Sequence, residues 1–129
     1  MTRDIETHIV DGDNPKNQLT ISVIDEPGAG GANHAYLIGN PPQAEGEGGQ
    51  RFWYPVNFQN GPIQENGVNG VTQEALLAIV IDRLRSFQAG PCSSDYNAEA
   101  LSCCEQAMSA LQGRTRERIF RGVEGKNEK

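Results

Sequence analysis

The chain has 129 residues and a mass of 14.0 kDa, a length that fits one domain and excludes a multidomain enzyme. Hydrophobic residues make up only 36% beside 15 glycines and 7 prolines, so the core is thin, which favours completion by a partner subunit. The net charge of -6 argues against coating of duplex nucleic acid or an anionic membrane, but not against a small anionic ligand.

Residues 1–71 have the features of an antiparallel sheet. Period-2 alternation predicts a strand over Gln18 to Ile24, and a second short strand covers His34 to Ile38. A third strand is expected over Arg51 to Phe58, where Pro55 indicates an edge strand or a bulge. Short connections predict antiparallel pairing, and no element is predicted for residues 1–17.

Three kinds of turn signal lie between or after these strands. The run Gly28 to Gly31 could offer amides to a phosphate, but it lacks GxxxxGK[ST] and no helix follows it, so a plain turn is the better interpretation. Residues 39–50 are rich in Gly, Pro and Glu and predict a mobile loop. Asn-Gly pairs at positions 60, 66 and 69 are typical of tight hairpins.

Residues 72–129 change to helical periodicity. Thr72 is a good N-cap for a helix through about Phe87, with one largely apolar face formed by Leu76, Ile79, Val80, Arg83, Leu84 and Phe87. A second helix begins near Ser94 or Asp95 and stops near Gly113, and a third, shorter one covers residues 114–121. The fold class is therefore α+β, an N-terminal antiparallel sheet followed by a C-terminal helical hairpin with a short third helix.

The charge reverses at the C-terminal end. Residues 1–112 carry a net charge of -9, whereas residues 113–129 carry +3. Arg114, Arg118 and Arg121 share one stripe if this segment is helical, and Arg116 points elsewhere. Two interpretations stay open: an anion site, or a solvated helix whose arginines pair with Glu117 or with acidic residues of the sheet.

Metal and catalytic chemistry find little support. The odd number of cysteines argues against a disulfide framework, and no zinc spacing joins the available donors, which are His8, His34, Cys92, Cys103 and Cys104. Asp11-Gly12-Asp13 resembles the start of a calcium loop, but Pro15 occupies the next ligand position. No GxSxG is present, and the sequence predicts no catalytic residue, metal or cofactor.

Two side chains in the helical part have a structural and a ligand-binding interpretation each. Phe87 could complete the core or offer its ring to a flat ligand. Asn97 lies in the first turn of the second helix, where its amide could serve in capping or read a hydroxyl or base edge.

Long blocks of the chain resemble a known family. The stretches are IDEPGAGGANHAYLI, FQNGPIQENGVNGVTQEALLAIVIDRLRSFQAGP, NAEALSCCEQAMSAL and GRTRERIFRGVEG. They are similar to phage Thoeris anti-defence proteins of the first type, which share their helical hairpin with a phage anti-CBASS sponge. The similarity extends from about residue 19 to residue 129, whereas residues 1–17 and the loop 39–50 match nothing in the family.

The resemblance implies a sponge, which binds and hides a host immune signal without cleaving it. The signals are cyclic ADP-ribose isomers (glycocyclic ADP-ribose) made by TIR enzymes, and some members also hold cyclic di- or trinucleotides at a second site. Carried onto this chain, the family's ligand contacts fall on Phe87, Asn97, Arg114 and Arg118, with Arg121 a weaker candidate.

The resemblance also implies a homo-oligomer, a dimer or a hexamer, in the cytoplasm of an infected bacterium. Two other functions are weighed against the sponge. A hydrolase of the same signal needs a general base or metal near Arg114, and a nucleic-acid or protein interaction module using the basic segment is disfavoured by the acidic remainder. The chain has no apolar segment suited to a signal peptide or a membrane span, so a soluble protein is expected.

Overall fold

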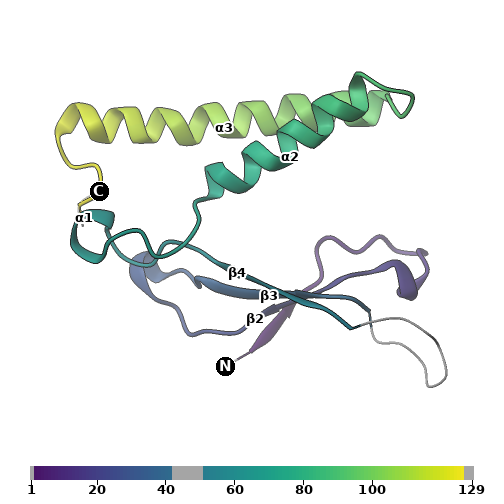
Figure 1. Cartoon of the computed structure of the whole chain (residues 1–129), viewed down its shortest axis with the longest axis horizontal. Helices are drawn as coiled ribbons and strands as arrows, with labels where there is room; N and C mark the ends of the chain where they lie inside the picture. The colour runs from purple at the N-terminus through teal and green to yellow at the C-terminus, as the bar shows by residue number, and fades with distance from the viewer. Residues whose placement is uncertain (1, 42–50, 127–129) are drawn as a thin grey trace. The chain divides into compact units, whose positions relative to one another are not determined.

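The computed structural model describes residues 2–41 and 51–126, which contain four strands followed by three helices (Figure 1). The backbone divides into two compact units, residues 1–61 and residues 62–129. Most of the loop predicted over 39–50 lies outside the described residues. None of the helices in the described ranges is long and apolar enough to cross a membrane.

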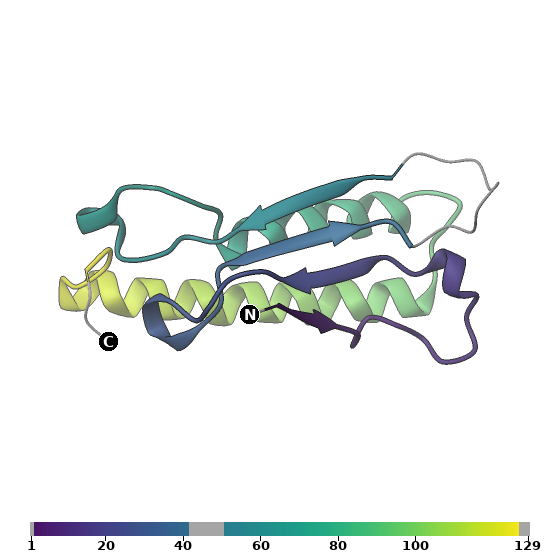
Figure 2. The ribbon, with the colours of Figure 1, turned by 90° about the horizontal axis from the view of Figure 1, so that it is seen from below.

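The first unit is a four-stranded antiparallel sheet with the strands in chain order. It consists of β1 (Arg3–Ile5), β2 (Thr20–Val23), β3 (Ala35–Gly39) and β4 (Trp53–Asn57), and Figure 2 shows them side by side. This confirms the predicted fold class and the three expected strands. β1 is an additional strand that alternation did not reveal, because it has only three residues and two of them are charged.

β4 is an edge strand, as Pro55 indicated. Pro55 lies opposite Leu37 of β3, and the proline, which has no N–H to donate, is tolerated because β4 has a neighbour on one side only. Trp53 of β4 lies opposite Gly39, and a Cβ on Gly39 would come within 2.6 Å of the Trp53 ring. Glycine at position 39 therefore permits the close approach of the indole.

The Asn-Gly pairs do not form hairpins, so that prediction was wrong. They lie in the connection from β4 to α2, where residues Ile63–Asn66 form the short helix α1. Gly67 ends α1 with a φ of 70°, and its N–H bonds the carbonyl of Ile63. Asn66-Gly67 thus supplies the residue of positive φ after a helix, a role that local sequence does not distinguish from a hairpin turn.

The second unit is built around a helical hairpin of α2 (Gln73–Gln88) and α3 (Asp95–Arg121). Thr72 Oγ1 accepts from the N–H of Ala75 at 3.1 Å, which confirms Thr72 as the N-cap of α2. Ser94 caps α3 in the same way through the N–H of Asn97.

The buried faces of both helices follow heptad-like spacing. The side chains of α3 that are at least partly buried lie at positions 97, 101, 104, 108, 111, 115 and 118, and those of α2 lie at 74, 76, 77, 81, 84 and 88. The apolar face predicted for α2 was right at Leu76 and Leu84, which are partly buried. It was wrong in the middle of the helix, where Ile81 is buried and Ile79 and Val80 are 60% and 45% exposed. α2 carries apolar residues on two adjacent faces, so periodicity did not identify the packed one.

α3 does not stop near Gly113 but continues for two more turns to Arg121. The expected third helix is thus its continuation, and the short additional helix of the fold is α1. A mid-helix glycine costs about 1 kcal/mol relative to alanine, and Leu111 and Thr115 on either side of Gly113 are partly buried. The helix ends instead at Gly122, which has a left-handed φ of 75°.

Candidate functional site

Phe87 lies on the last turn of α2 and is 36% exposed. The guanidinium of Arg83 sits 5.1 Å from the centre of its ring. The cation therefore covers one face of the ring, and the core interpretation does not hold for the whole side chain. A planar ligand can stack only on the other face.

Asn97 has a structural role at the start of α3. Its N–H bonds Ser94 Oγ at 3.0 Å and its Nδ2 donates to the carbonyl of Cys92 at 3.3 Å, so Asn97 braces the α2–α3 connection. Its Oδ1 makes no hydrogen bond within the described part of the chain. The amide is thus oriented by the protein while its acceptor stays available to a ligand hydroxyl or amine.

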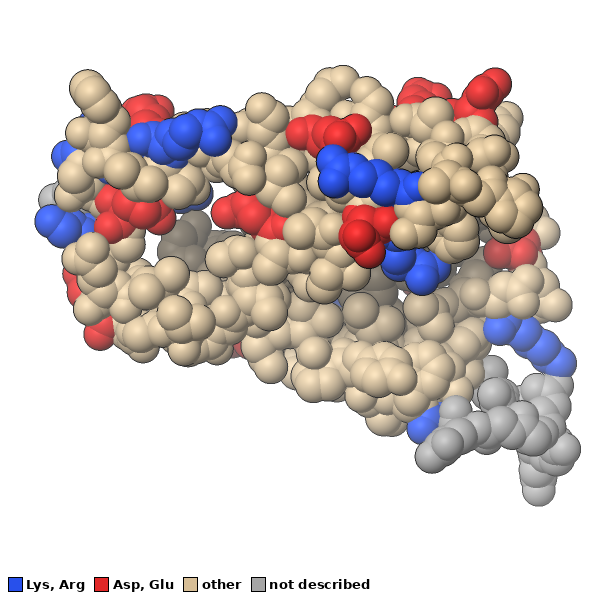
Figure 3. All heavy atoms as spheres, turned by 45° about the horizontal axis from the view of Figure 1, so that its top comes forward, with Lys and Arg blue, Asp and Glu red and all other residues tan. Residues whose placement is uncertain are grey.

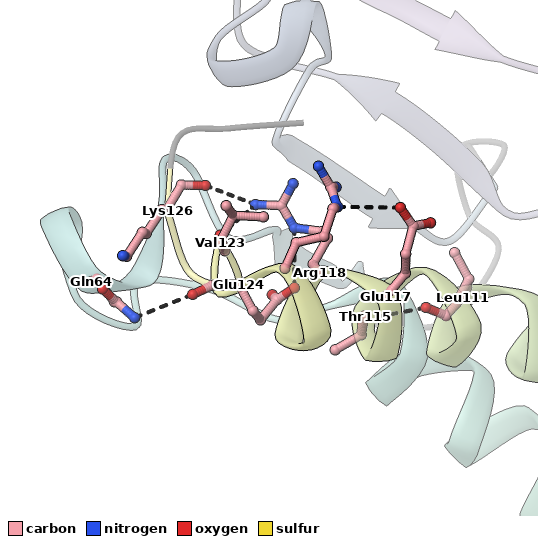
Figure 4. A network of polar contacts seen from close by, with 9 residues as sticks. Gln64, Leu111, Thr115, Glu117, Arg118, Val123, Glu124 and Lys126 are labelled. Carbon is pink, nitrogen blue, oxygen red and sulfur yellow. Dashed lines mark hydrogen bonds and ion pairs between the residues drawn. The ribbon is translucent and has the colours of Figure 1, made fainter.

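Arg118 is buried, with 8% of its surface exposed, and its guanidinium is occupied by the protein itself (Figure 4). Nε donates to Glu124 Oε2 at 3.1 Å, and Nη2 donates to the carbonyls of Val123 and Lys126, each at 2.9 Å. These contacts hold the segment after α3 folded back against the helix. We refer to residues 122–126 with Arg118 as the C-terminal clasp.

The C-terminal clasp is also hydrogen-bonded to α1. Gln64 of α1 donates from its N–H to the carbonyl of Gly125 and from Nε2 to the carbonyl of Glu124. Gly125 has a φ of 78°, and a Cβ there would come within 3.1 Å of the Gln64 side chain. The clasp thus joins segments about sixty residues apart in sequence.

The arginine stripe is divided by this packing. Arg114 is exposed and has no ion pair or hydrogen bond with any residue in 2–41 or 51–126. Arg121 pairs with Glu117 at 3.2 Å, an i,i+4 pair in which both side chains are largely exposed. The expected pairing with Glu117 is found for Arg121, whereas Arg118 pairs with Glu124, which follows α3 and does not belong to the sheet.

The candidate residues form two groups within one chain. Phe87 and Asn97 lie at the connection end of the hairpin, where the Ser94 N–H bonds Gln88 Oε1. Arg114, Arg118 and Arg121 lie at the other end of α3 (Figure 1). At a rise of about 1.5 Å per residue, Asn97 and Arg114 are separated by about 25 Å along the helix.

The residues considered above for metal or phosphate binding do not form a site within the described ranges. The residues that the structure describes contain no group of three or more His, Cys, Asp and Glu able to hold a metal ion. The glycine run closes on itself through the N–H of Gly28 and the carbonyl of Ala32 at 2.8 Å, which supports the plain turn. Asp25 braces the same loop by accepting the N–H of His34 at 2.9 Å, and this hydrogen bond lowers the pKa of its carboxyl.

Sequence reasoning missed the partners of Arg118, which are Val123, Glu124 and Lys126. Two glycines three residues apart, Gly122 and Gly125, were the available signal, because both adopt positive φ and turn the chain back toward α3. The position of Arg118 was the second signal. It continues the series of buried positions on α3, and a buried guanidinium needs hydrogen-bond acceptors from the protein itself.

The helical hairpin resembles a known protein domain. A family model described as the Acb2/Tad1 hairpin domain matches residues 55–116, from within β4 through α2 and most of α3. Residues 55–116 of the chain are therefore similar to an Acb2/Tad1 hairpin domain. Phe87, Asn97 and Arg114 fall inside the matched region, whereas Arg118 and Arg121 lie beyond it.

A curated relative extends the comparison. The chain is 50% identical over 74 residues to "Thoeris anti-defense 1" of Bacillus phage SBSphiJ7. The match covers 57% of this chain and 52% of that protein, so the chain spans about half the length of the curated relative it matches. The resemblance to the Thoeris anti-defence proteins is thereby confirmed.

Proposed function

We propose that this protein is an anti-defence sponge that binds a cyclic ADP-ribose isomer made by TIR enzymes and withholds it from the Thoeris effector. The observation that carries the proposal is the match of the hairpin to the Acb2/Tad1 domain, together with 50% identity to a protein named for Thoeris anti-defence. In this proposal the protein acts in the cytoplasm of an infected bacterium.

The exposed candidate residues suit such a ligand, which contains a purine, two riboses and a diphosphate. The free face of Phe87 can stack on the purine. The Oδ1 of Asn97 can accept from a ribose hydroxyl or a base amine, in an orientation that its bond to Cys92 already holds. The guanidinium of Arg114 can form paired hydrogen bonds with the diphosphate.

The two arginines further along α3 take other roles in this proposal. Arg118 positions the end of α3 through the C-terminal clasp and does not itself bind the diphosphate, because its donors serve Glu124 and two carbonyls. Arg121 adds positive potential near Arg114 and can exchange Glu117 for a ligand oxygen, since that exposed pair is worth little.

The site proposed here is completed by a second copy of the chain. A single ligand the size of a cyclic dinucleotide cannot contact both Asn97 and Arg114 of one chain across about 25 Å of helix. A homo-oligomer that brings the connection end of one hairpin to the C-terminal end of another supplies the full set of contacts. Two such sites arise in a symmetric dimer.

Sequestration rather than hydrolysis is the proposed mechanism. To outcompete an effector a sponge needs affinity in the nanomolar range, about -12 kcal/mol, which stacking and a charge clamp at an interface can supply. Hydrolysis needs a base or metal beside Arg114, and the described residues offer no metal cluster.

The test is a release experiment. The protein is incubated with glycocyclic ADP-ribose, separated from free ligand, denatured by heat, and the supernatant is analysed by mass spectrometry. Recovery of intact ligand in proportion to protein supports the sponge, whereas a new product indicates the hydrolase. If no ligand is retained before heating, and none is consumed, the proposed function is wrong.

Matched variants locate the site. Arg114→Ala removes the proposed diphosphate contact, and Arg116→Ala removes another exposed arginine from the opposite side of α3. We expect retention of ligand by the Arg116 variant and its loss by the Arg114 variant. Equal retention by both contradicts the role of Arg114.

A further inference from the structure

Arg83 lies one helical turn before Phe87 on α2, and its side chain is exposed. Its guanidinium carbon is 5.1 Å from the centre of the Phe87 ring. Arg83 makes no hydrogen bond or ion pair with any residue in 2–41 or 51–126. The contact with the ring therefore leaves the N–H groups of the guanidinium without an acceptor from the described part of the chain.

The neighbouring Arg85 differs from Arg83 in this respect. Arg85 is also exposed, but it donates to Glu105 Oε2 of α3 at 2.9 Å and so joins the two helices of the hairpin. The positions three and four residues away from Arg83 on α2 are Ile79, Val80, Ser86 and Phe87. None of these neighbours is acidic, so α2 itself offers Arg83 no ion pair.

The charge at the connection end of the hairpin is mainly negative. Residues 82–106 carry four acidic residues and two arginines, namely Asp82, Asp95, Glu99, Glu105, Arg83 and Arg85. Figure 3 shows acidic side chains at this end of the hairpin, at the upper right. Because Arg85 pairs with Glu105, Arg83 is the one cation of residues 82–106 that pairs with no carboxylate of the described ranges. It is thus the cation of this segment that an anion bound beside Phe87 can use.

We propose that Arg83 is a further ligand-binding residue, which binds a phosphate oxygen of a ligand whose base stacks on Phe87. The inference rests on the proposed function, because it adds a residue to the same site. A cation over an exposed aromatic ring is held weakly, whereas a charge-assisted hydrogen bond from arginine to phosphate is strong. The guanidinium therefore leaves the ring for the phosphate oxygen when such a ligand binds.

This role defines the chemical class of ligand that the connection end of the hairpin accepts. Arg114 lies about 25 Å along α3 from Asn97, too far to neutralise a phosphate beside Asn97 of the same chain. Arg83 is five residues before the end of α2, on the same end of the hairpin as Phe87 and Asn97. The connection end thus suits a planar base that carries a phosphate group, and an uncharged nucleoside leaves Arg83 without a partner.

The affinities of matched variants test the contact. Arg83→Gln removes the charge but keeps a long polar side chain, Arg83→Lys keeps the charge, and Arg85→Gln removes an exposed arginine from the same helix. Calorimetry with glycocyclic ADP-ribose should show a Kd raised by about tenfold or more in Arg83→Gln and by less in Arg83→Lys. Arg85→Gln should change Kd by less than about twofold, because its partner is an exposed carboxylate of the protein. Equal affinities of Arg83→Gln and the parent protein overturn the proposal.

The salt dependence of Kd separates a contact with the ligand from an effect on the Phe87 ring. An ion pair with phosphate is screened by salt, so the Kd of the parent protein should rise with NaCl more steeply than that of Arg83→Gln. If Arg83→Gln binds more weakly but keeps the salt dependence of the parent, Arg83 only orients the ring and the ligand contact is refuted. Glutamine and lysine are good helix formers, so we expect unchanged helical circular dichroism in every variant.

Failure of the proposed function gives a different result. If the parent protein binds glycocyclic ADP-ribose and Arg83→Gln binds it equally well, only the role of Arg83 is wrong. If the parent protein itself shows no binding, the proposed function fails, and the role of Arg83 fails with it.

Discussion

Replacing Arg118 with alanine tests whether the C-terminal clasp is a structural element. The substitution removes two hydrogen bonds to carbonyls at 2.9 Å and the bond to Glu124 at 3.1 Å. The Glu124 side chain is 39% exposed, so that ion pair contributes little beyond the two carbonyl bonds. Each bond from a charged donor is worth about 1.5–3 kcal/mol, and with partial rehydration of the carbonyls the total loss is about 3 kcal/mol.

The assay is thermal unfolding followed by circular dichroism at a helical wavelength. For a chain of this size a loss of about 3 kcal/mol lowers Tm by about 10 °C. We also expect the end of α3 to lose helical signal before the main transition, because the clasp closes its last turn. Amide hydrogen exchange over residues 115–126 measures that local opening.

Arg114→Ala is the control on the same helix. It is exposed and unpaired within the described ranges, so its substitution should change stability by no more than about 0.5 kcal/mol. The loss of stability in Arg118→Lys should lie between those of Arg114→Ala and Arg118→Ala, because one ammonium cannot reproduce the several directed contacts of the guanidinium. If Arg118→Ala melts at the parent temperature, the reasoning is refuted and Arg118 becomes available as a ligand residue.

Three further predictions follow from individual side chains. Phe87→Ala should weaken glycocyclic ADP-ribose binding by about 2 kcal/mol or more in calorimetry, with Tm nearly unchanged; unaltered affinity contradicts the stacking role. Gly113→Ala should raise the free energy of unfolding by about 1 kcal/mol, because a Cβ there meets no atom within 4 Å; a lower Tm contradicts a continuous α3. The pKa of Asp25 in the folded protein lies below its ordinary 3.8, so the stability that this carboxylate contributes is present above pH 3.8 and is lost as the pH falls through the folded pKa. Asp25→Asn should therefore make Tm less dependent on pH in that range. An unchanged dependence of Tm on pH contradicts the role of the hydrogen bond from His34.

Much of the fold was accessible from local sequence patterns. Alternation located β2, and Pro55 indicated an edge strand or a bulge, of which the edge strand is found at β4. The caps at Thr72 and Ser94 were predicted within one residue, since a cap depends on bonds to the next few residues only. The Asn-Gly pairs misled because the same dipeptide suits a hairpin turn and the end of a helix.

The errors in the helical part have a common cause. Periodicity gives the angular position of each side chain on its own helix, but not which side meets another element. α2 has apolar residues on two adjacent sides, and only contact with α3 shows that Ile81 is inside and Val80 outside. Similarly, Gly113 ends a helix in local terms, but α3 continues through it to Arg121 and ends at Gly122.

The sequence by itself determined the class of fold, the hairpin, the charge reversal after residue 112 and the residues with ligand chemistry. Only the tertiary structure decided which of these residues are available. Arg114 and Arg118 are indistinguishable in type and one helical turn apart, yet one is exposed and the other is enclosed by Val123, Glu124 and Lys126. The reason is physical: the bonds that enclose Arg118 come from a segment that turns back at Gly122, and local spacing along α3 does not encode that contact.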